Sequence, residues 1–296
     1  MTSVLYDAPG PRTRRNTAIG TTVALVLLAG VVALAVVQLG ANGQLDGEKW
    51  GPFFNPGNRY FTATWRALGV GLGNTLVAAA LTLVLALAIG TALAVLRISS
   101  TPVYRWLVVG VIELLRGLPV VITIFLAARV LPEIGITLPP LWYLVIGLTL
   151  YNCVIIAEIV RAGVAALPQG QSEAASAVGL TRFQVLRIIL LPQAFRIMLP
   201  ALISQLVVIV KDTSLGFIIF GFSEFVRTAN TVIQFFGGQE EINLPLQAYT
   251  AVALLFILIN YGLGKLAEYV QRRSGRASRS AAVAVRAPVR VGTGGG

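Results

Sequence analysis

The chain has 296 residues, of which 56% are apolar and 12% are charged. Soluble domains have roughly 45–50% apolar and about 25% charged residues, so this composition excludes a soluble globular enzyme and also a disordered chain. The chain has no histidine and a single cysteine, Cys153. Imidazole catalysis, histidine-based or cysteine-rich metal sites and an intrachain disulfide are therefore excluded, and we expect no catalytic residue, metal or cofactor.

Six stretches of low charge follow one another along the chain, and each is close to the roughly 20 apolar residues that a transmembrane helix needs. The first follows a basic segment, as a signal peptide would, but its apolar run is longer than about 15 residues, which favours an uncleaved anchor. The sequence predicts an all-α integral membrane protein with six transmembrane helices. The predicted spans are residues 19–39, 67–96, 106–131, 141–160, 197–222 and 246–266.

The positive charges predict which side of the membrane each loop occupies. With the N-terminus inside, fifteen of the 23 Lys and Arg residues lie on inner segments and four on outer segments. Cytoplasmic loops of membrane proteins carry this excess of positive charge. We therefore expect both termini in the cytoplasm of a bacterial cell. The membrane lipid surface then accounts for the net charge of +11, without a nucleic-acid partner.

A charge pair and a proline stand inside the third predicted span, where an ionisable side chain costs about 2.5–3.5 kcal/mol. Glu113 and Arg116 are three residues apart, so they share a helix face and can pair. Pro119 predicts a kink directly after them. The pair either lines a pathway through the membrane or forms a structural ion pair between helices, and both interpretations stay open.

Four polar residues, 211–214, stand in the middle of the fifth predicted span. Neighbouring side chains in a helix point about 100° apart, so Lys211 and Asp212 cannot both face one partner. This run, followed by Gly216, predicts a weakened or broken helix of the kind that lines a water-filled site in transporters. Structural pairing with neighbouring helices is the alternative. The candidate substrate-pathway residues are therefore Glu113, Arg116, Lys211, Asp212, Thr213 and Ser214.

The loop between the fourth and fifth predicted spans, residues 161–196, predicts two short helices. Residues 171–178 are good helix formers, and Gly179 is a natural C-terminal stop. The Thr-x-x-Gln pattern at 181–184 predicts a capping box for a second helix, which Pro192 would end. Two short helices joined at a glycine would form a compact knob on the inner surface.

The same loop carries the pattern E-A-A-x-x-x-G-x(9)-I-x-L-P. This pattern resembles the loop of ABC-importer permease subunits, which in that family docks into the cognate ATPase. The resemblance implies that this segment is an ATPase-coupling loop. The residues that carry the pattern are Glu173, Ala174, Ala175, Gly179, Ile189, Leu191 and Pro192.

Three further segments resemble motifs of polar amino-acid permeases of the histidine, glutamine and glutamate type. Residues 113–119 resemble E-x-x-R-G-T-P, residues 157–163 resemble A-E-I-x-R-G-G, and residues 211–215 match K-D-T-S-L. The sequence departs from that family at Leu118, Thr123 and Ser204, where Thr, Gln and Asn are common. These departures leave the class intact and put the exact substrate contacts in doubt.

The resemblance also implies a domain organisation. A five-helix permease core covers residues 64–268 and contains the coupling loop at 161–196. An extra transmembrane helix at residues 19–39 precedes this core. A cytoplasmic N-terminal tail at residues 1–18 and a disordered basic cytoplasmic tail at residues 269–296 complete the chain.

The resemblance implies a permease subunit of an ATP-driven importer that carries a polar amino acid across the cytoplasmic membrane. The implied partners are a cytoplasmic ABC ATPase dimer, a sister permease subunit (identical or different) and an extracytoplasmic solute-binding protein. The chain has no G-x-x-x-x-G-K-[ST] loop, so we expect a partner to hydrolyse ATP and this chain not to be an enzyme. The alternative is an ion-coupled secondary amino-acid transporter. Many of those are built from two internal repeats, whereas the six spans here include one extra N-terminal helix and do not divide into two matching halves.

The candidate pathway residues favour one class of amino acid. Glu113 can occupy Arg116 at three-residue spacing, whereas Lys211 faces away from Asp212 and is the better candidate for a free cation. The second carboxylate of an acidic substrate would need such a cation. The sequence therefore favours glutamate over glutamine, and both over arginine.

Overall fold

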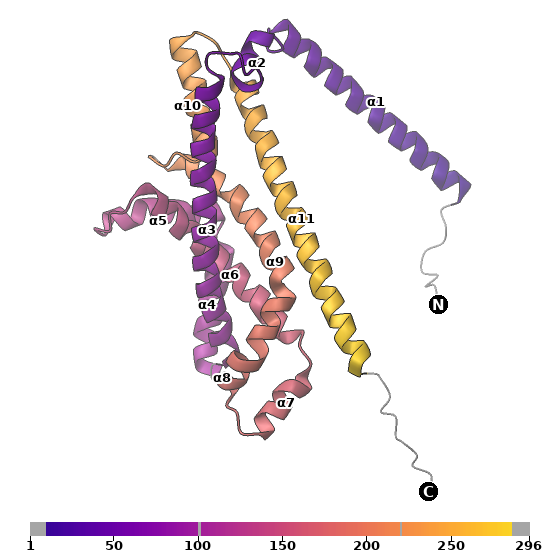
Figure 1. Cartoon of the computed structure of the whole chain (residues 1–296), viewed down its shortest axis with the longest axis vertical. Helices are drawn as coiled ribbons and strands as arrows, with labels where there is room; N and C mark the ends of the chain where they lie inside the picture. The colour runs from indigo at the N-terminus through magenta and orange to yellow at the C-terminus, as the bar shows by residue number, and fades with distance from the viewer. Residues whose placement is uncertain (1–9, 100–101, 220, 286–296) are drawn as a thin grey trace.

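The structure, a computed structural model, describes residues 10–99, 102–219 and 221–285. Its regular elements in these ranges are all helical, as Figure 1 shows. In chain order they are α1 (Pro11–Ala41), α2 (Gly47–Phe54), α3 (Phe61–Ser99), α4 (Pro102–Gly117), α5 (Val120–Glu133), α6 (Pro140–Ala165), α7 (Gln169–Ala177), α8 (Arg182–Gln184), the π-helical η1 (Val185–Leu190), α9 (Leu191–Asp212), the 3-10 helix η2 (Thr213–Ile218), α10 (Phe225–Gln239) and α11 (Pro245–Val285).

The described helices are long and apolar enough for five membrane spans, or six if one bent pair counts as a span. The five are α1, α3, α6, the continuous helix Arg182–Phe217 and α11. The predicted all-α membrane architecture is therefore confirmed, and five of the six predicted spans correspond to single helices. The third predicted span does not.

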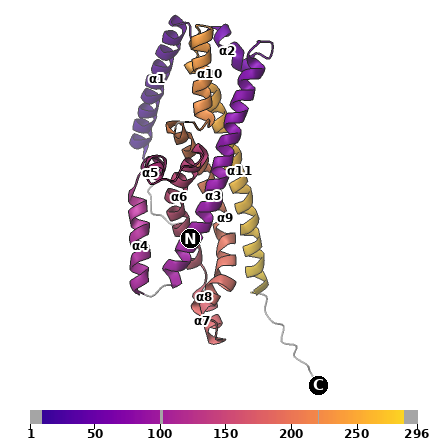
Figure 2. The same cartoon turned by 90° about the vertical axis from the view of Figure 1, so that its left-hand side faces the viewer.

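The third predicted span, residues 106–131, is wrong as one continuous helix. It consists of α4 and α5, which meet at an angle of 99°, so that α5 lies across the bundle at mid-height (Figures 1 and 2). Pro119 has no N–H, and its carbonyl accepts hydrogen bonds from Ile122 and Thr123 at 2.9 and 3.3 Å, which starts a new helix. The expected kink at Pro119 is thus a complete break.

Small residues allow the central helices to pack closely. A Cβ at Gly90 of α3 would lie 2.6 Å from the carbonyl oxygen of Cys153 on α6. A Cβ at Gly147 of α6 would lie 2.5 Å from the backbone Cα of Ile124, so this glycine seats α5 against α6. Such close approach of backbones is the usual basis of helix association in membranes.

One end of the bundle is covered by the short helices α2 and α10 (Figure 1). Phe53 of α2 and Phe225 and Phe236 of α10 are at most 2% exposed and belong to one apolar cluster with residues of α3 and α11. We call this region the closed end. Burial of three aromatic side chains makes it a major source of stability within the chain.

A buried carboxyl group caps α10 at the closed end, between the spans that end at Phe217 and begin at Pro245. Glu224 accepts hydrogen bonds from the backbone N–H groups of Val226 and Arg227, both at 2.6 Å. Burial raises the pKa of Glu224 to about 7, although these two bonds and the charge of Arg227 act in the opposite direction.

Helix α1 stands away from the rest of the bundle (Figures 1 and 2). None of its residues is buried. Its connection to α2 is nevertheless held in place, because the carbonyl oxygen of Gln44 accepts hydrogen bonds from Trp50 Nε1 at 3.0 Å and from Gln247 Nε2 at 2.7 Å. The chain therefore fixes the base of α1 and leaves its apolar surface uncovered.

The C-terminal tail differs from the expectation of disorder from residue 269. Helix α11 continues without a break to Val285. The segment is rich in alanine and arginine, which are strong helix formers, and it has no proline before Pro288. Residues 286–296 lie outside the described part of the chain.

Candidate functional site

The loop between α6 and α9 folds into two short helices, as the sequence predicts. Helix α7 ends at Ala177, and Gly179 follows with φ +89°, a left-handed conformation that favours glycine. Thr181 caps α8: its hydroxyl accepts a bond from the Gln184 N–H, and the Gln184 side chain accepts one from the Thr181 N–H. We call residues 169–184 the knob, and it lies at the end of the molecule remote from the closed end (Figure 1).

The prediction that Pro192 ends the second short helix is wrong. The chain passes from α8 through the π-helical η1 directly into α9, and Pro192 stands in the first turn of α9. Proline is tolerated in the first turn, where the N–H would have no intrahelical partner. The knob is therefore continuous with a membrane-spanning helix that runs to Phe217.

The residues of the loop pattern occupy different environments. Ala175 is buried, with its carbonyl oxygen accepting the Leu180 N–H at 3.2 Å, and it packs the turn around Gly179. Glu173 and Ala174 are exposed on α7. Ile189 and Leu191 are partly buried at the junction of η1 and α9, where Leu191 packs against the core.

Two exposed apolar side chains on the knob were missed by the sequence reasoning. Val178 is 78% exposed and Phe183 is 51% exposed. Both lie beside the turn at Gly179, so this tip presents an apolar surface that no element in the described part of the chain covers. Val178 directly precedes the glycine stop and Phe183 stands inside the capping box, and these positions are a signal that the sequence did offer.

Hydrogen bonds tie the knob to its supporting helices. Gln171 of α7 donates to the Gln193 side chain of α9 at 3.2 Å. At the base of the loop, Glu158 of α6 binds Arg97 of α3 and also Arg161, the latter at 2.8 Å. Glu158 therefore forms a structural salt bridge between α3 and α6 at this end of the bundle. These contacts hold α3, α6, α7 and α9 together at this end.

The expected pairing of Glu113 with Arg116 is not formed. Both side chains are exposed on α4, and no ion pair or hydrogen bond joins them in the described part of the chain. Glu113 instead lines a pocket with Arg105 of α4 and Arg182 of α8. This pocket reaches the knob, which sequence spacing alone did not indicate.

The run at residues 211–214 weakens the helix, as predicted, but does not break the continuous span that runs to Phe217. Helix α9 ends at Asp212 and continues as the narrower η2. The hydroxyls of Thr213 and Ser214 donate to the carbonyl oxygens of Val210 and Lys211, both at 2.7 Å, so they are satisfied by their own helix. The exposed Lys211 ammonium has no hydrogen-bond or ion-pair partner among the described residues.

The structure does not bring the two groups of candidate pathway residues together. Helix α4 packs against α3 and α6, whereas α9 packs against α3, α6 and α11. No described hydrogen bond or ion pair links Glu113 or Arg116 to Lys211 or Asp212. The candidate residues on α4 and those at the end of α9 therefore do not form a single site among the described residues of this chain.

A buried amide pair also lies between α6 and α9. Gln205 donates to the Asn152 side chain at 2.7 Å, and Asn152 donates to the Leu148 carbonyl oxygen at 2.8 Å. Both side chains are at most 8% exposed, so this pair fixes the register of the two spans. Among the described residues there is no group of three or more Cys, Asp and Glu side chains that could hold a metal ion.

The sequence is similar to membrane components of transport systems. The sequence model described as "Binding-protein-dependent transport system inner membrane component" matches residues 85–276. The "Glutamate transport system permease protein GluD" of Corynebacterium glutamicum is 42% identical over 252 residues, which are 82% of this chain and 86% of that protein. The "Probable glutamine ABC transporter permease protein GlnP" of Bacillus subtilis is 32% identical over 67% of this chain and 89% of that protein.

A solved structure has the same fold over most of its length. It is the "Crystal structure of an amino acid ABC transporter with histidines". The TM-score is 0.63 at 25% sequence identity, and the match covers 72% of this chain and 96% of that chain.

Proposed function

Since the chain belongs to the family of binding-protein-dependent transport system inner membrane components, we propose that it carries glutamate across the membrane in an ATP-driven importer. The expected permease function agrees with this membership, and the alternative of a secondary transporter finds no support in it. The glutamate permease relative, which aligns with most of the chain, is the single observation that carries the assignment of the substrate.

In this proposal the knob receives the energy of ATP hydrolysis. The chain lacks the glycine-rich phosphate loop of ATPases, so the energy comes from a partner ATPase dimer. The exposed Val178 and Phe183 are suited to an apolar groove on that ATPase, with the exposed carboxylate of Glu173 beside them. The continuous path from the knob through η1 into α9 would carry a movement of the ATPase to residues 211–214.

The distribution of charge supports an orientation with the knob in the cytoplasm. The knob, the start of α4 and the end of α11 lie at one end of the bundle (Figures 1 and 2). Together with the end of α3 and the rest of the loop at residues 161–196, these segments carry ten of the fifteen Lys and Arg residues that an inner location would explain. The closed end then faces the outside, where the solute-binding protein delivers the amino acid. A second permease subunit, identical or different, would complete the passage.

Glutamate suits the cation that the structure leaves available. Lys211 is exposed beside the change from α9 to η2, and it has no ion-pair partner in the described residues. An acidic amino acid needs one more cation than a neutral one, and Lys211 can supply it. Asp212 points about 100° away from Lys211 along the helix, so it would not hold the ammonium of the same substrate molecule. Glu113 and Arg116 on α4 are the other candidate pathway residues.

Uptake of labelled glutamate, glutamine and arginine tests the substrate. We expect glutamate uptake to exceed glutamine uptake in cells that carry the complete transporter, and Lys211→Met to lower glutamate uptake at least tenfold. Lys265→Met is the matched control, because Lys265 pairs with Glu268 on the exposed surface of α11 at 3.1 Å. Arginine uptake without glutamate uptake would contradict the substrate assignment. Unchanged glutamate uptake in Lys211→Met would remove Lys211 from the pathway.

A further inference from the structure

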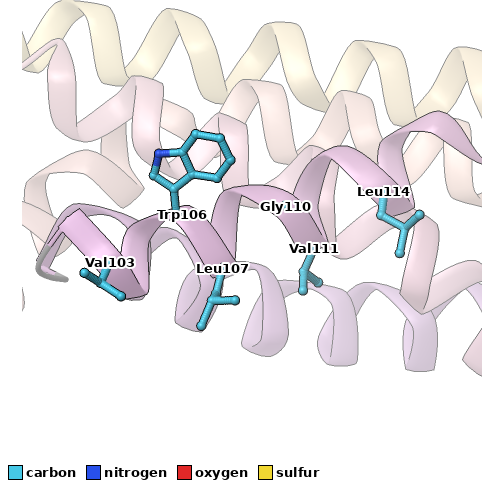
Figure 3. A pocket seen from close by; sticks show the side chains of 6 residues that line it. All are labelled: Val103, Trp106, Leu107, Gly110, Val111 and Leu114. Atoms are coloured by element: carbon cyan, nitrogen blue, oxygen red, sulfur yellow. The ribbon is translucent and has the colours of Figure 1, made fainter.

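Helix α4 has an exposed apolar groove along one side. Val103, Leu107, Val111 and Leu114 recur at helical spacing and are between 49% and 73% exposed. Figure 3 shows three of them, Val103, Leu107 and Val111, pointing to one side of the helix, with the indole of Trp106 on the other and Gly110 between. The groove has a volume of about 800 Å³ and almost no polar surface.

A basic pocket adjoins this groove at its wall. It has a volume of about 710 Å³, and its charged lining residues are Arg105 and Glu113 of α4 and Arg182 of the knob. Trp106 and Gly110 line both the pocket and the groove, so the two cavities adjoin at these residues. Neither guanidinium has a hydrogen-bond or ion-pair partner among the described residues, which leaves both donor sets available.

The pocket and the groove together match one kind of molecule. Two guanidinium groups bind a phosphate through charge-assisted hydrogen bonds. An apolar groove that begins at the same place accepts a hydrocarbon chain. Basic pockets between transmembrane helices on the cytoplasmic side are suited to anionic lipid headgroups. Trp106, which is 83% exposed at the junction, is a residue type that settles at the membrane interface.

We propose that this composite site binds an anionic phospholipid of the inner leaflet, with its phosphate between Arg105 and Arg182 and one acyl chain along α4. The proposal rests on the cytoplasmic placement of the knob. Because Arg182 is the first residue of α8, a bound lipid would link the knob to α4 and restrain its movement. Glu113 also lines this pocket, about two helical turns from Arg105 along α4, and its carboxylate disfavours a phosphate placed close to it.

Lipid binding to the purified complex with its ATPase, measured by native mass spectrometry with phosphatidylglycerol and phosphatidylcholine, tests the proposal. We expect phosphatidylglycerol to be retained in preference to phosphatidylcholine, and Arg105→Gln with Arg182→Gln to weaken its binding about tenfold. Arg187→Gln is the matched control, since Arg187 is an exposed arginine on the same segment that does not line the pocket. Equal binding in the wild type and the double variant would overturn the proposal.

A second variant blocks the groove instead of the pocket. A Cβ at Gly110 would meet nothing within 4 Å, so Gly110→Leu fills the junction without disturbing the fold, and we expect it to reduce phosphatidylglycerol binding at least fivefold. Gly30→Leu on α1, where a Cβ also meets nothing, is the control. Unchanged binding in Gly110→Leu would contradict an acyl chain in the groove.

Cross-linking distinguishes a lipid from a protein that covers the same surface. The one native cysteine, Cys153, is buried, so Leu107→Cys introduces a single reactive thiol in the groove. We expect this thiol to react with a membrane-soluble maleimide and not to cross-link to a second permease subunit. An efficient cross-link would assign the groove to the subunit interface and overturn the proposal. Because these experiments measure lipid and not transport, their outcome is independent of whether the substrate is glutamate.

Discussion

The two ends of the bundle are built in opposite ways. At the closed end, α2 and α10 bury Phe53, Phe225 and Phe236 within the chain. At the other end, the side chains of Val178 and Phe183 on the knob are exposed. Both ends use short helices and apolar side chains, but only one of them completes its own core.

This difference separates stability from coupling. An apolar side chain that is buried within the chain contributes to folding, whereas one that is exposed on a well-ordered turn contributes only when a partner covers it. We therefore expect substitutions at the closed end to change stability and substitutions at the knob to change assembly and ATP-driven transport.

The largest effect is expected at Gly179. A residue with a side chain is strained at φ +89°, so Gly179→Arg should reorient α7 against α8 and lower substrate-stimulated ATPase activity and uptake more than tenfold. Membrane insertion should be unchanged. Gly179→Asn is the matched control, because asparagine tolerates the left-handed region, and it should keep most of the activity. Full ATPase stimulation in Gly179→Arg would show that the knob does not couple the subunits.

The next effect is expected at the closed end. Phe53 is 1% exposed, and Phe53→Ala should lower the free energy of unfolding by about 3–5 kcal/mol, because it leaves a cavity in the aromatic cluster. Thermal unfolding in detergent would measure the loss. The neighbouring Phe54 is 50% exposed, so Phe54→Ala should cost little. Equal losses in both variants would mean that the cluster does not stabilise the closed end.

A smaller effect, on ATPase binding and not on stability, is expected at Phe183. Phe183→Ala should leave thermal stability unchanged, because the side chain is 51% exposed, and should weaken ATPase binding about tenfold. Pull-down of the ATPase at graded concentrations would measure this. Phe54→Ala, a similarly exposed phenylalanine at the opposite end, should leave ATPase binding unaltered. Destabilisation of the isolated subunit by Phe183→Ala would contradict the claim that the knob contributes to assembly and not to folding.

The smallest effect is a pH dependence at the closed end. The pKa of Glu224 is about 7 in the folded chain, above its ordinary value, so the folded state holds a proton that the unfolded state releases. Stability should therefore fall as the pH rises from about 4.5 to about 7, by an amount that shifts the unfolding temperature by a few degrees. Glu224→Gln should remove this dependence. If the stability of the wild type, and not that of Glu224→Gln, rises with pH over this range, the pKa of Glu224 is lowered and not raised in the folded chain.

Local signals in the sequence predict the knob well. A glycine stop and a Thr-x-x-Gln capping box each depend on residues within one or two turns, so Gly179 and Thr181 adopt the expected conformations. The membrane spans are also predictable, because their apolar composition is a property of each segment by itself.

Tertiary packing decides the features that the sequence did not predict. The 99° break after α4 depends on the packing of α5 against Gly147 of α6, which lies some thirty residues further along the chain. Three-residue spacing permits Glu113 to pair with Arg116, but Glu113 lies instead in a pocket with Arg182 of a distant segment. Basic, non-periodic composition predicts disorder from residue 269, whereas α11 extends to Val285, because arginine and alanine are good helix formers.

Reconstituted transport tests the central claim most directly. Proteoliposomes would contain this permease with its ATPase and any sister subunit, together with the solute-binding protein, labelled glutamate and ATP on the appropriate sides. The account predicts that glutamate accumulates only when ATP and the binding protein are both present, and that Gly179→Arg abolishes this accumulation while the protein remains inserted. Glutamate accumulation driven by an ion gradient without the ATPase would contradict it.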